Sequence, residues 1–119
     1  MAEIRPEPVP RPEWSALPHP GCINVDGKVL LHTDNLLIAM LRFSPHATIH
    51  EHDAGWDIDV VCLDGRGLVS VNGVISPFQT SERIHWPAGC MHRLRIEQDA
   101  MITLMVEYIP ADFPPPPPL

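Results

Sequence analysis

The sequence predicts an all-β protein, an antiparallel β-barrel whose two ends are extended and rich in proline. Of the 15 prolines, six lie in residues 1–20 and six in residues 110–119. Proline removes a backbone donor and fixes φ, so a sheet domain should occupy the middle of the chain. There, Asn72-Gly73 separates two apolar segments, which is the strongest local signal for a two-residue hairpin. No segment of useful length repeats with a helical period.

A chain of 119 residues is a single domain by length. We expect a proline-rich arm at 1–21, the barrel at 22–110 and a polyproline tail at 111–119. Residues 114–118 should adopt polyproline II, and a solvated end is favoured over a ligand for an aromatic groove. The arm carries Trp14, which we expect to pack on the barrel or on a neighbouring subunit.

The strands are predicted from short apolar and β-branched runs that are bounded by Gly, Pro, Asn or Asp. Asp26-Gly27 and Asp34-Asn35 are expected to form turns between them. The runs lie at residues 28–32, 36–43, 48–52, 57–63, 67–71, 82–86, 92–96 and 101–109.

Two of these runs are apolar on both faces, at residues 60–63 and 101–106. A strand with one face in water would alternate polar and apolar residues, so these strands should lie between two layers or at a subunit contact. A small antiparallel barrel that forms a homodimer satisfies this pattern.

The formal net charge is −7, so the basic surface that nucleic acids and anionic membranes require is absent. Small-molecule or protein partners are favoured, and a small-molecule substrate is expected. The N-terminus lacks the apolar core of a secretory signal, and no apolar run approaches the ~18 residues of a membrane span. We therefore expect a cytoplasmic protein.

The cysteines, Cys22, Cys62 and Cys90, are odd in number and form no C-x-x-C pair. This argues against a disulfide framework and against a zinc knuckle. Cys62 lies in an apolar run and should be core. Cys90 could be a ligand or a redox-sensitive neighbour of a site, but unligated cysteine usually packs as a small hydrophobe.

Three histidines carry the functional prediction. His50 and His52 form an His-x-His pair, and successive strand side chains alternate, so both imidazoles should share one face. His92 follows the turn residues Pro87 and Gly89, from which a barrel could bring it across to the pair. The three together predict a metal site. His46 is expected at the rim of a loop, and the remaining histidines are expected to be structural: His19, His32 and His85.

The chain resembles the cupin superfamily in two motifs, most closely the small single-domain members with a conserved barrel. The first family motif contains His-x-His, then a glutamate and a glycine, for which this chain offers His50-x-His52 and Gly65. The second contains Pro-x-Gly-x-x-His, which matches Pro87-x-Gly89-x-x-His92. The resemblance covers about residues 36–108 and implies a double-sheet jelly-roll barrel. Ser44, Ser81 and Ile96 replace the motif residues Gly, Gly and Asn.

The position of the family's glutamate differs between two ways of counting. Counting on from His52 gives Asp57, and counting back from Gly65 gives Ile58. Either Asp57 or Asp59 could turn inward, or neither, and Asp57 is favoured. Both begin an otherwise apolar strand, where an unpaired buried carboxylate would be costly. The predicted metal ligands are therefore His50, His52, His92 and Asp57.

Such a site suits Fe(II), with Zn, Mn, Ni and Cu as alternatives, and three protein ligands leave coordination positions open. The resemblance implies a small metal-dependent enzyme acting on a small oxygen-bearing substrate. A dioxygenase is favoured, because a three-histidine site resembles the thiol and diketone dioxygenase branch of the family. Isomerases, lyases and cyclases share the fold. The other hypothesis is a non-catalytic module that binds a metal or ligand. The catalytic residues are not predicted.

Overall fold

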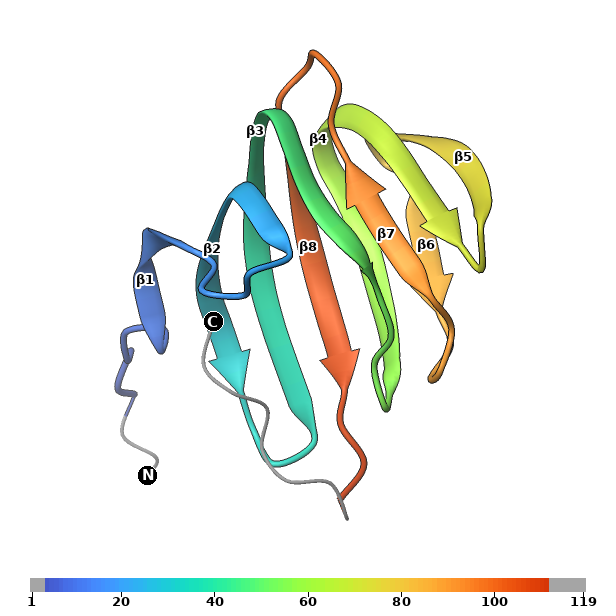
Figure 1. The fold of residues 1–119 in the computed structure, drawn as a ribbon. Helices are drawn as coiled ribbons and strands as arrows, with labels where there is room; N and C mark the ends of the chain where they lie inside the picture. Colours follow the sequence, from blue (N-terminus) through green and yellow to red (C-terminus); the bar gives the residue numbers. More distant parts are fainter. Residues whose placement is uncertain (1–3, 112–119) are drawn as a thin grey trace.

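The structure is a computed structural model that describes residues 4–111, and these residues form β-strands and no helix (Figure 1). The described part of the chain therefore contains no helix long and apolar enough to cross a membrane. The strands are β1 (Arg11–Ala16), β2 (Cys22–His32), β3 (Leu36–His52), β4 (Asp57–Val71), β5 (Val74–Gln79), β6 (Arg83–Trp86), β7 (His92–Arg95) and β8 (Met101–Tyr108).

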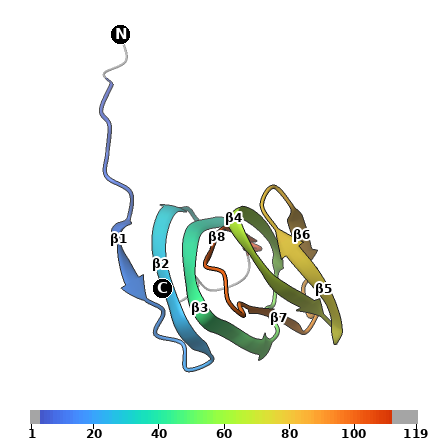
Figure 2. The same ribbon diagram turned by 90° about the horizontal axis from the view of Figure 1, so that it is seen from above.

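All strand pairs are antiparallel, and the main path runs β1-β2-β3-β7-β4-β5. The long strands β3 and β4 each change partner along their length. The first half of β3 pairs with β8 and its second half with β7, while β4 pairs with β6 and β8 first and then with β5 and β7. The sheet therefore folds into two layers, and seen from above the strands enclose a central space (Figure 2). This is the predicted antiparallel barrel.

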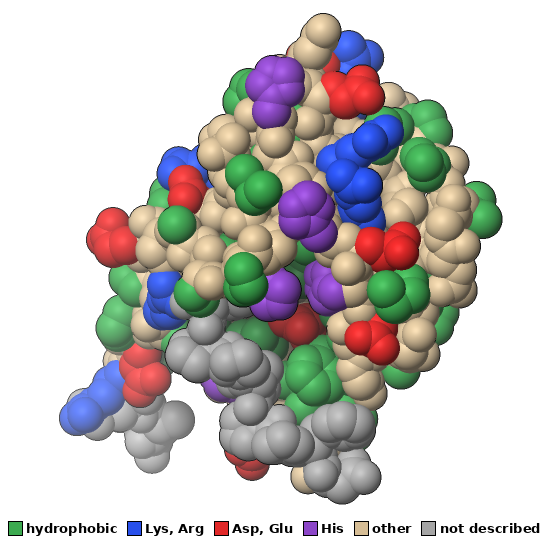
Figure 3. Space-filling view, in the orientation of Figure 1, with side chains coloured by type: hydrophobic (Ala, Val, Ile, Leu, Met, Phe, Trp, Pro, Cys, Tyr) green, Lys and Arg blue, Asp and Glu red, His purple; other side chains and the backbone are tan. Residues whose placement is uncertain are grey.

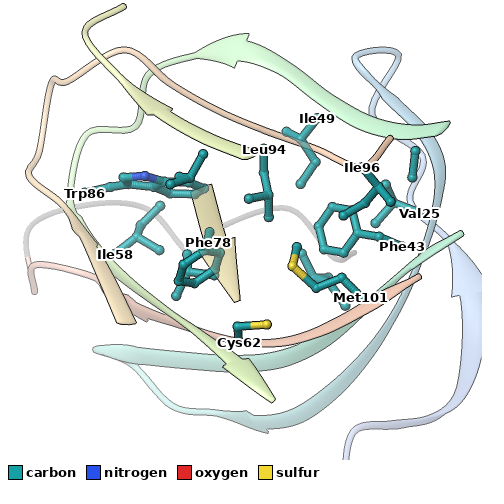
Figure 4. Close-up of a cluster of buried hydrophobic side chains, with 14 of the residues drawn as sticks. Val25, Phe43, Ile49, Ile58, Cys62, Phe78, Trp86, Leu94, Ile96 and Met101 are labelled. Atoms are coloured by element: carbon teal, nitrogen blue, oxygen red, sulfur yellow. The ribbon is translucent and has the colours of Figure 1, made fainter. Parts of the chain in front are cut away.

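The core lies between the two layers. Phe43 on β3, Trp86 on β6, Leu94 on β7 and Met101 on β8 are each at most 1% exposed, and Figure 4 shows them converging from opposite walls. Burying an aromatic or aliphatic side chain of this size contributes about 1.5–3 kcal/mol. The apolar runs on β4 and β8 that the sequence placed between layers supply Val60, among other residues of this core.

The strand predictions at residues 36–43 and 48–52 are one strand in the structure. Pro45 lies at the join, where the pairing with β8 ends at Phe43 and the pairing with β7 begins at Thr48. His46 there has a φ of 65°. The chain passes from one layer to the other within one continuous strand, which a reading of separate runs cannot detect. Residues 57–63 and 67–71 are joined in the same way into β4.

Two turn predictions are confirmed and one is wrong. Asn72 (φ 48°) and Gly73 (φ 82°) join Val71 to its partner Val74 in the expected two-residue hairpin, and Asp34-Asn35 lies between β2 and β3. Asp26-Gly27 is not a turn but lies within β2, where both residues pair with β3. Asp26 there forms an ion pair with Arg42 across the strands, at 2.8 Å, which compensates its weak β-propensity.

The N-terminal arm packs on the barrel, which is one of the two positions expected for Trp14. Its strand β1 pairs with β2, and the Trp14 ring lies between two cations, 4.7 Å from Lys28 Nζ and 4.5 Å from Arg42 Cζ. Both contacts are cation–π interactions. The predicted polyproline segment at 114–118 lies outside the described residues.

Candidate metal and substrate site

A cavity of about 530 Å³ opens between the two layers of the barrel. Most of its wall is apolar, and Figure 3 shows histidine and acidic side chains around a hollow on the face viewed there. The polar side chains that line the cavity are His19, His52, Asp53, His92 and Glu107. A concave apolar pocket with a few convergent polar groups is the usual form of a small-molecule site.

The centre of the polar end is the pair His52 and His92. These residues lie directly opposite each other on β3 and β7, and their Nε2 atoms are 3.2 Å apart. Trp86 stacks on the His92 ring at 4.1 Å between centroids, with 7° between the planes. The stack holds the His92 ring in one orientation.

The tautomer of His52 follows from its hydrogen bond. Its Nδ1 lies 2.8 Å from the carbonyl oxygen of His50. A carbonyl can only accept, so Nδ1 carries the proton and Nε2 keeps its lone pair. The Nε2 atom that faces His92 therefore offers a lone pair, which can accept a hydrogen bond from His92 Nε2 or bind a metal.

His92 is 1% exposed. Burial, together with the nearby positive charge that His52 can carry, lowers the pKa of His92 to about 4, although a hydrogen bond with the backbone of Cys90 partly offsets this. Its imidazole is neutral at physiological pH, the form that binds metals.

His50 does not join this pair. Ile49 pairs with Leu94 and His52 with His92, so three steps along β3 correspond to two along β7. This β-bulge places an extra residue between Ile49 and His52 and lets both face inward. His50 is left exposed and does not line the cavity. The expectation that both imidazoles of the pair share a face assumed an unbulged strand.

Asp57 and Asp59 lie outside the cavity as well. Ile58 between them lines the cavity, and alternation turns both carboxylates to the other face of β4. Asp57 Oδ1 accepts a hydrogen bond from the Ala88 backbone N–H at 2.8 Å. His85 Nε2 lies 3.3 Å from the second oxygen of Asp57.

Asp59 is held by a network on the same outer face. Its two oxygens accept hydrogen bonds from His85 Nδ1 at 2.9 Å and from the Tyr108 hydroxyl at 2.8 Å, and Arg83 lies at 3.6 Å. Burial acts to raise the pKa of Asp59, but these hydrogen bonds and charges outweigh it and lower the pKa. The Asp59 carboxylate thus has its partners without a metal.

Glu107 is a carboxylate that, like Asp53, does line the cavity, and no sequence motif singled it out. It lies on β8 directly opposite Ile58, so the two side chains enter the barrel together. Glu107 Oε1 accepts a hydrogen bond from Trp56 Nε1 at 3.0 Å. Burial raises the pKa of Glu107, although that hydrogen bond and the charge of His52 act in the opposite direction. Only the pairing register, which long-range contacts fix, reveals this position.

His19 is the second residue that sequence reasoning missed, since it was expected to be structural. It lies in the segment between β1 and β2 and lines the cavity, with its ring 5.9 Å from that of His52. The only sequence signal was its place in the proline-rich arm beside Gly21, which does not specify a direction.

The remaining candidates Cys90, His32 and His46 do not line the cavity. Cys90 is buried, burial raises the pKa of its thiol, and its Sγ lies 3.8 Å from His92 Nδ1. His32 and His46 are exposed. Arg93 and Arg95 line grooves outside the cavity, on the face of β7 opposite His92.

The side chains of the cavity fit the predicted metal ion only in part. Among residues 4–111, no three His, Cys, Asp or Glu side chains are grouped so as to hold a metal ion. The pair His52 and His92 does fit two ligands of one ion. Nitrogen ligands about 2.0–2.1 Å from a metal lie about 2.9–3.4 Å apart for octahedral to tetrahedral angles, and the two Nε2 atoms are separated by 3.2 Å.

No protein-family model and no curated protein matches the sequence. Solved structures do match. The polyketide cyclase RemF from Streptomyces resistomycificus is 20% identical, with a TM-score of 0.77 over 93% of this chain and 83% of that one. A cupin-2 domain protein from Rhodospirillum rubrum is 19% identical, with a TM-score of 0.75 over 97% and 84%.

An RmlC-like cupin from Shewanella frigidimarina is 16% identical, with a TM-score of 0.72 over 84% of this chain and 86% of that one. At these identities the likeness concerns the fold alone. The chain shares with these proteins the arrangement of its strands.

Proposed function

Since the chain has the cupin fold, we propose that it is a metal-dependent enzyme that converts a small oxygen-bearing organic molecule inside its barrel. The observation that carries this proposal is the pair of Nε2 atoms of His52 and His92, 3.2 Å apart, at the polar end of a largely apolar cavity. A closed structural site would fill its coordination with protein ligands, whereas this pair faces open space.

His52 and His92 would hold the metal, Fe(II) being favoured, with Zn, Mn, Ni and Cu as alternatives. His50 and Asp57 complete the ligand set that the sequence predicts, and each would need a changed conformation to reach the pair. When bound, the metal would polarise a substrate carbonyl or hydroxyl oxygen and, if it is iron, would supply redox chemistry with O2.

The residues of the chain itself contribute binding, orientation and exclusion of water. The apolar wall, which includes Trp56 and Trp86, takes the carbon skeleton of the substrate and removes water from the polar end. Trp56 donates its indole N–H to Glu107 and so fixes the direction of that carboxyl group. The Glu107 carboxyl faces the same space as the two histidines and can exchange a hydrogen bond with the substrate.

We favour dioxygenation as the reaction, since two or three imidazoles with a distant carboxylate suit an iron centre with open positions. Cyclisation is the second candidate. It is favoured by the partly buried carboxyl of Glu107 in the cavity, because a proton-exchanging group beside a polarised carbonyl is what enolate chemistry requires. The similarity to a polyketide cyclase over 93% of the chain also favours it.

The proposal is tested by metal analysis of the purified protein and of His52→Ala and His92→Ala. We expect about one Fe(II) or another divalent ion per chain, and at least a tenfold weaker affinity in each variant because half of the imidazole pair is lost. His46→Ala is the matched control, since His46 is exposed and does not line the cavity. The proposal would be contradicted if the protein is purified without metal and His92→Ala then binds added divalent metal as well as wild type does.

The reaction class is tested on the metal-loaded protein. Oxygen uptake with a panel of diketones, thiols and catechols supports dioxygenation. Turnover of a linear polyketide mimic without oxygen uptake supports cyclisation. A protein that binds metal but turns over neither panel is the non-catalytic binding module.

A further inference from the structure

We propose that His19 is a substrate-binding residue whose Nε2–H donates a hydrogen bond to an oxygen of the molecule held at the His52–His92 pair. This assignment rests on the proposed function and names a residue outside both sequence motifs. It replaces His50 as the third imidazole that faces the cavity.

The position of His19 is fixed by the barrel. Its segment is tied down by backbone hydrogen bonds on both sides, from Leu17 N–H to the Val25 carbonyl at 3.1 Å and from Cys22 N–H to the His19 carbonyl at 2.9 Å. The Gly21 carbonyl also accepts a hydrogen bond from the His50 N–H at 2.9 Å. The bulged part of β3 therefore holds the segment that carries His19.

The tautomer of His19 is the opposite of that of His52. The Gly21 backbone N–H lies 3.0 Å from His19 Nδ1. An N–H can only donate, so Nδ1 is the acceptor and the neutral ring carries its proton on Nε2. His52 offers a lone pair to the cavity and His19 offers a donor. His19 thus suits an oxygen of the substrate, whereas a metal requires the nitrogen lone pair.

Gly21 is needed for this arrangement. A Cβ at this position would lie 3.2 Å from His19 Nδ1 and 3.3 Å from its Cε1, closer than most side-chain contacts. The absent side chain lets the imidazole lie over the backbone of residue 21, with its ring 5.9 Å from that of His52. A methyl group at this position would push the ring aside without removing it.

The class of ligand follows from the residues that line the cavity, which are histidines around His52 and His92 and mostly apolar side chains elsewhere. An oxygen near His52 and His92 would accept a hydrogen bond from His19, and the rest of the molecule would meet an apolar wall that includes Leu41, Trp56 and Met105. The cavity therefore fits a largely apolar molecule with a carbonyl, enolate or phenolate oxygen at one end.

The experiment measures the affinity of a chromogenic phenolate, 4-nitrocatechol, for the full-length protein loaded with Co(II). Five proteins are compared: wild type, His19→Ala, His19→Gln, Gly21→Ala and His46→Ala. Co(II) content is measured in each. We expect His19→Ala to raise the Kd about tenfold, as the loss of one charge-assisted hydrogen bond would, with unchanged Co(II) content.

The other variants sharpen this result. His19→Gln keeps an N–H donor and should recover part of the affinity, Gly21→Ala should give a smaller loss than His19→Ala, and His46→Ala, at an exposed position outside the cavity, should leave the Kd within about twofold of wild type. A His19→Ala protein that binds the probe like wild type overturns the assignment and leaves the proposed metal function intact. Loss of Co(II) from His19→Ala would make His19 a metal ligand and also overturns the assignment.

Failure of the underlying function is recognised before any variant is compared. A wild-type protein that takes up no Co(II) overturns the proposed function and the assignment with it.

Discussion

At the scale of single residues, the Asp59 carboxylate joins three strands on the outer face of the barrel. It lies on β4, and its partners lie on β6 (His85 and Arg83) and on β8 (Tyr108). These strands also form the wall of the cavity on their inner faces. The network therefore holds the cavity wall together without contributing a side chain to the cavity.

Asp59→Asn should lower the free energy of unfolding by about 1–3 kcal/mol at pH 7, because hydrogen bonds to a mostly buried charge are lost. Folding lowers the pKa of Asp59 below its usual 3.8. The stabilisation is therefore complete above that value and is lost as the pH falls through the lowered pKa. Urea unfolding of both proteins between pH 7 and pH 2.5 checks this.

The difference between wild type and Asp59→Asn should shrink below pH 3.8. Asp34→Asn is the matched control, since Asp34 is exposed in the turn between β2 and β3, and it should match wild type throughout. A difference that stays constant down to the lowest pH would contradict an ionised Asp59 as its cause.

The sequence could predict that His52 and His92 come together, because each lies in a motif with a local geometry of its own. It could not assign Asp57 or Glu107. The side that Asp57 faces depends on where β4 begins its alternation. Glu107 is brought to the cavity by its pairing opposite Ile58, 49 positions away in the chain.

At the scale of the elements, two glycines with positive φ set the course of β4. Gly65 (φ 85°) lies within the strand near a register shift between Cys62 and Asp64, and Gly73 (φ 82°) lies in the hairpin after it. The two glycines differ in their surroundings. A Cβ at Gly65 would collide with the Ala100 carbonyl oxygen, whereas a Cβ at Gly73 would meet no atom within 4 Å. The close approach of the β7–β8 connection to β4 thus depends on this glycine.

Gly65→Ala should therefore destabilise the protein by more than about 3 kcal/mol, since strain at positive φ and a backbone collision combine. Gly73→Ala, which meets nothing within 4 Å, should cost only about 1–2 kcal/mol from the φ strain. Urea unfolding measures both. Equal losses in the two variants would rule out the collision.

The strand positions could be predicted from the sequence, but the bulge in β3 could not. Runs of apolar residues gave the approximate positions of the strands, because alternation is a local property. The bulge between Ile49 and His52 is imposed by pairing with β7, and it reverses the facing of His52, the last residue of the strand. No local pattern indicates it.

At the scale of the whole molecule, the outer face of the layer that contains β3, β8 and β4 carries a row of apolar side chains. Met40, Leu104 and Val61 lie directly opposite one another in adjacent strands, and the alternate residues Leu41, Thr103 and Val60 are buried. This row agrees with the sequence, in which the runs at residues 60–63 and 101–106 are apolar on both faces. We propose that a second copy of the chain covers it.

We expect sedimentation velocity to give a dimer for wild type and a monomer for Leu104→Glu, because a charge in the centre of the row would lose its solvation on association. Ile75→Glu is the matched control, since Ile75 is 61% exposed on β5 in the other layer, and it should remain a dimer. Circular dichroism of each variant confirms folding. A wild-type monomer at all concentrations would contradict the proposal.

The overall architecture was the most predictable feature. Proline at the ends, turn residues between apolar runs and the absence of a helical period are sufficient for an all-β barrel, because each is a property of the backbone itself. The layer to which each half of β3 and β4 belongs was not predictable, since it depends on partners far along the chain.

The ends of the strand path have a consequence for how copies of this protein meet. The path ends at β1 and β5, and each of these strands contains a proline, Pro12 and Pro77. A proline withholds the N–H that an added strand would pair with, so both edges are poor templates for extending the sheet. Crowded molecules are thereby discouraged from adding a strand at either end of this path.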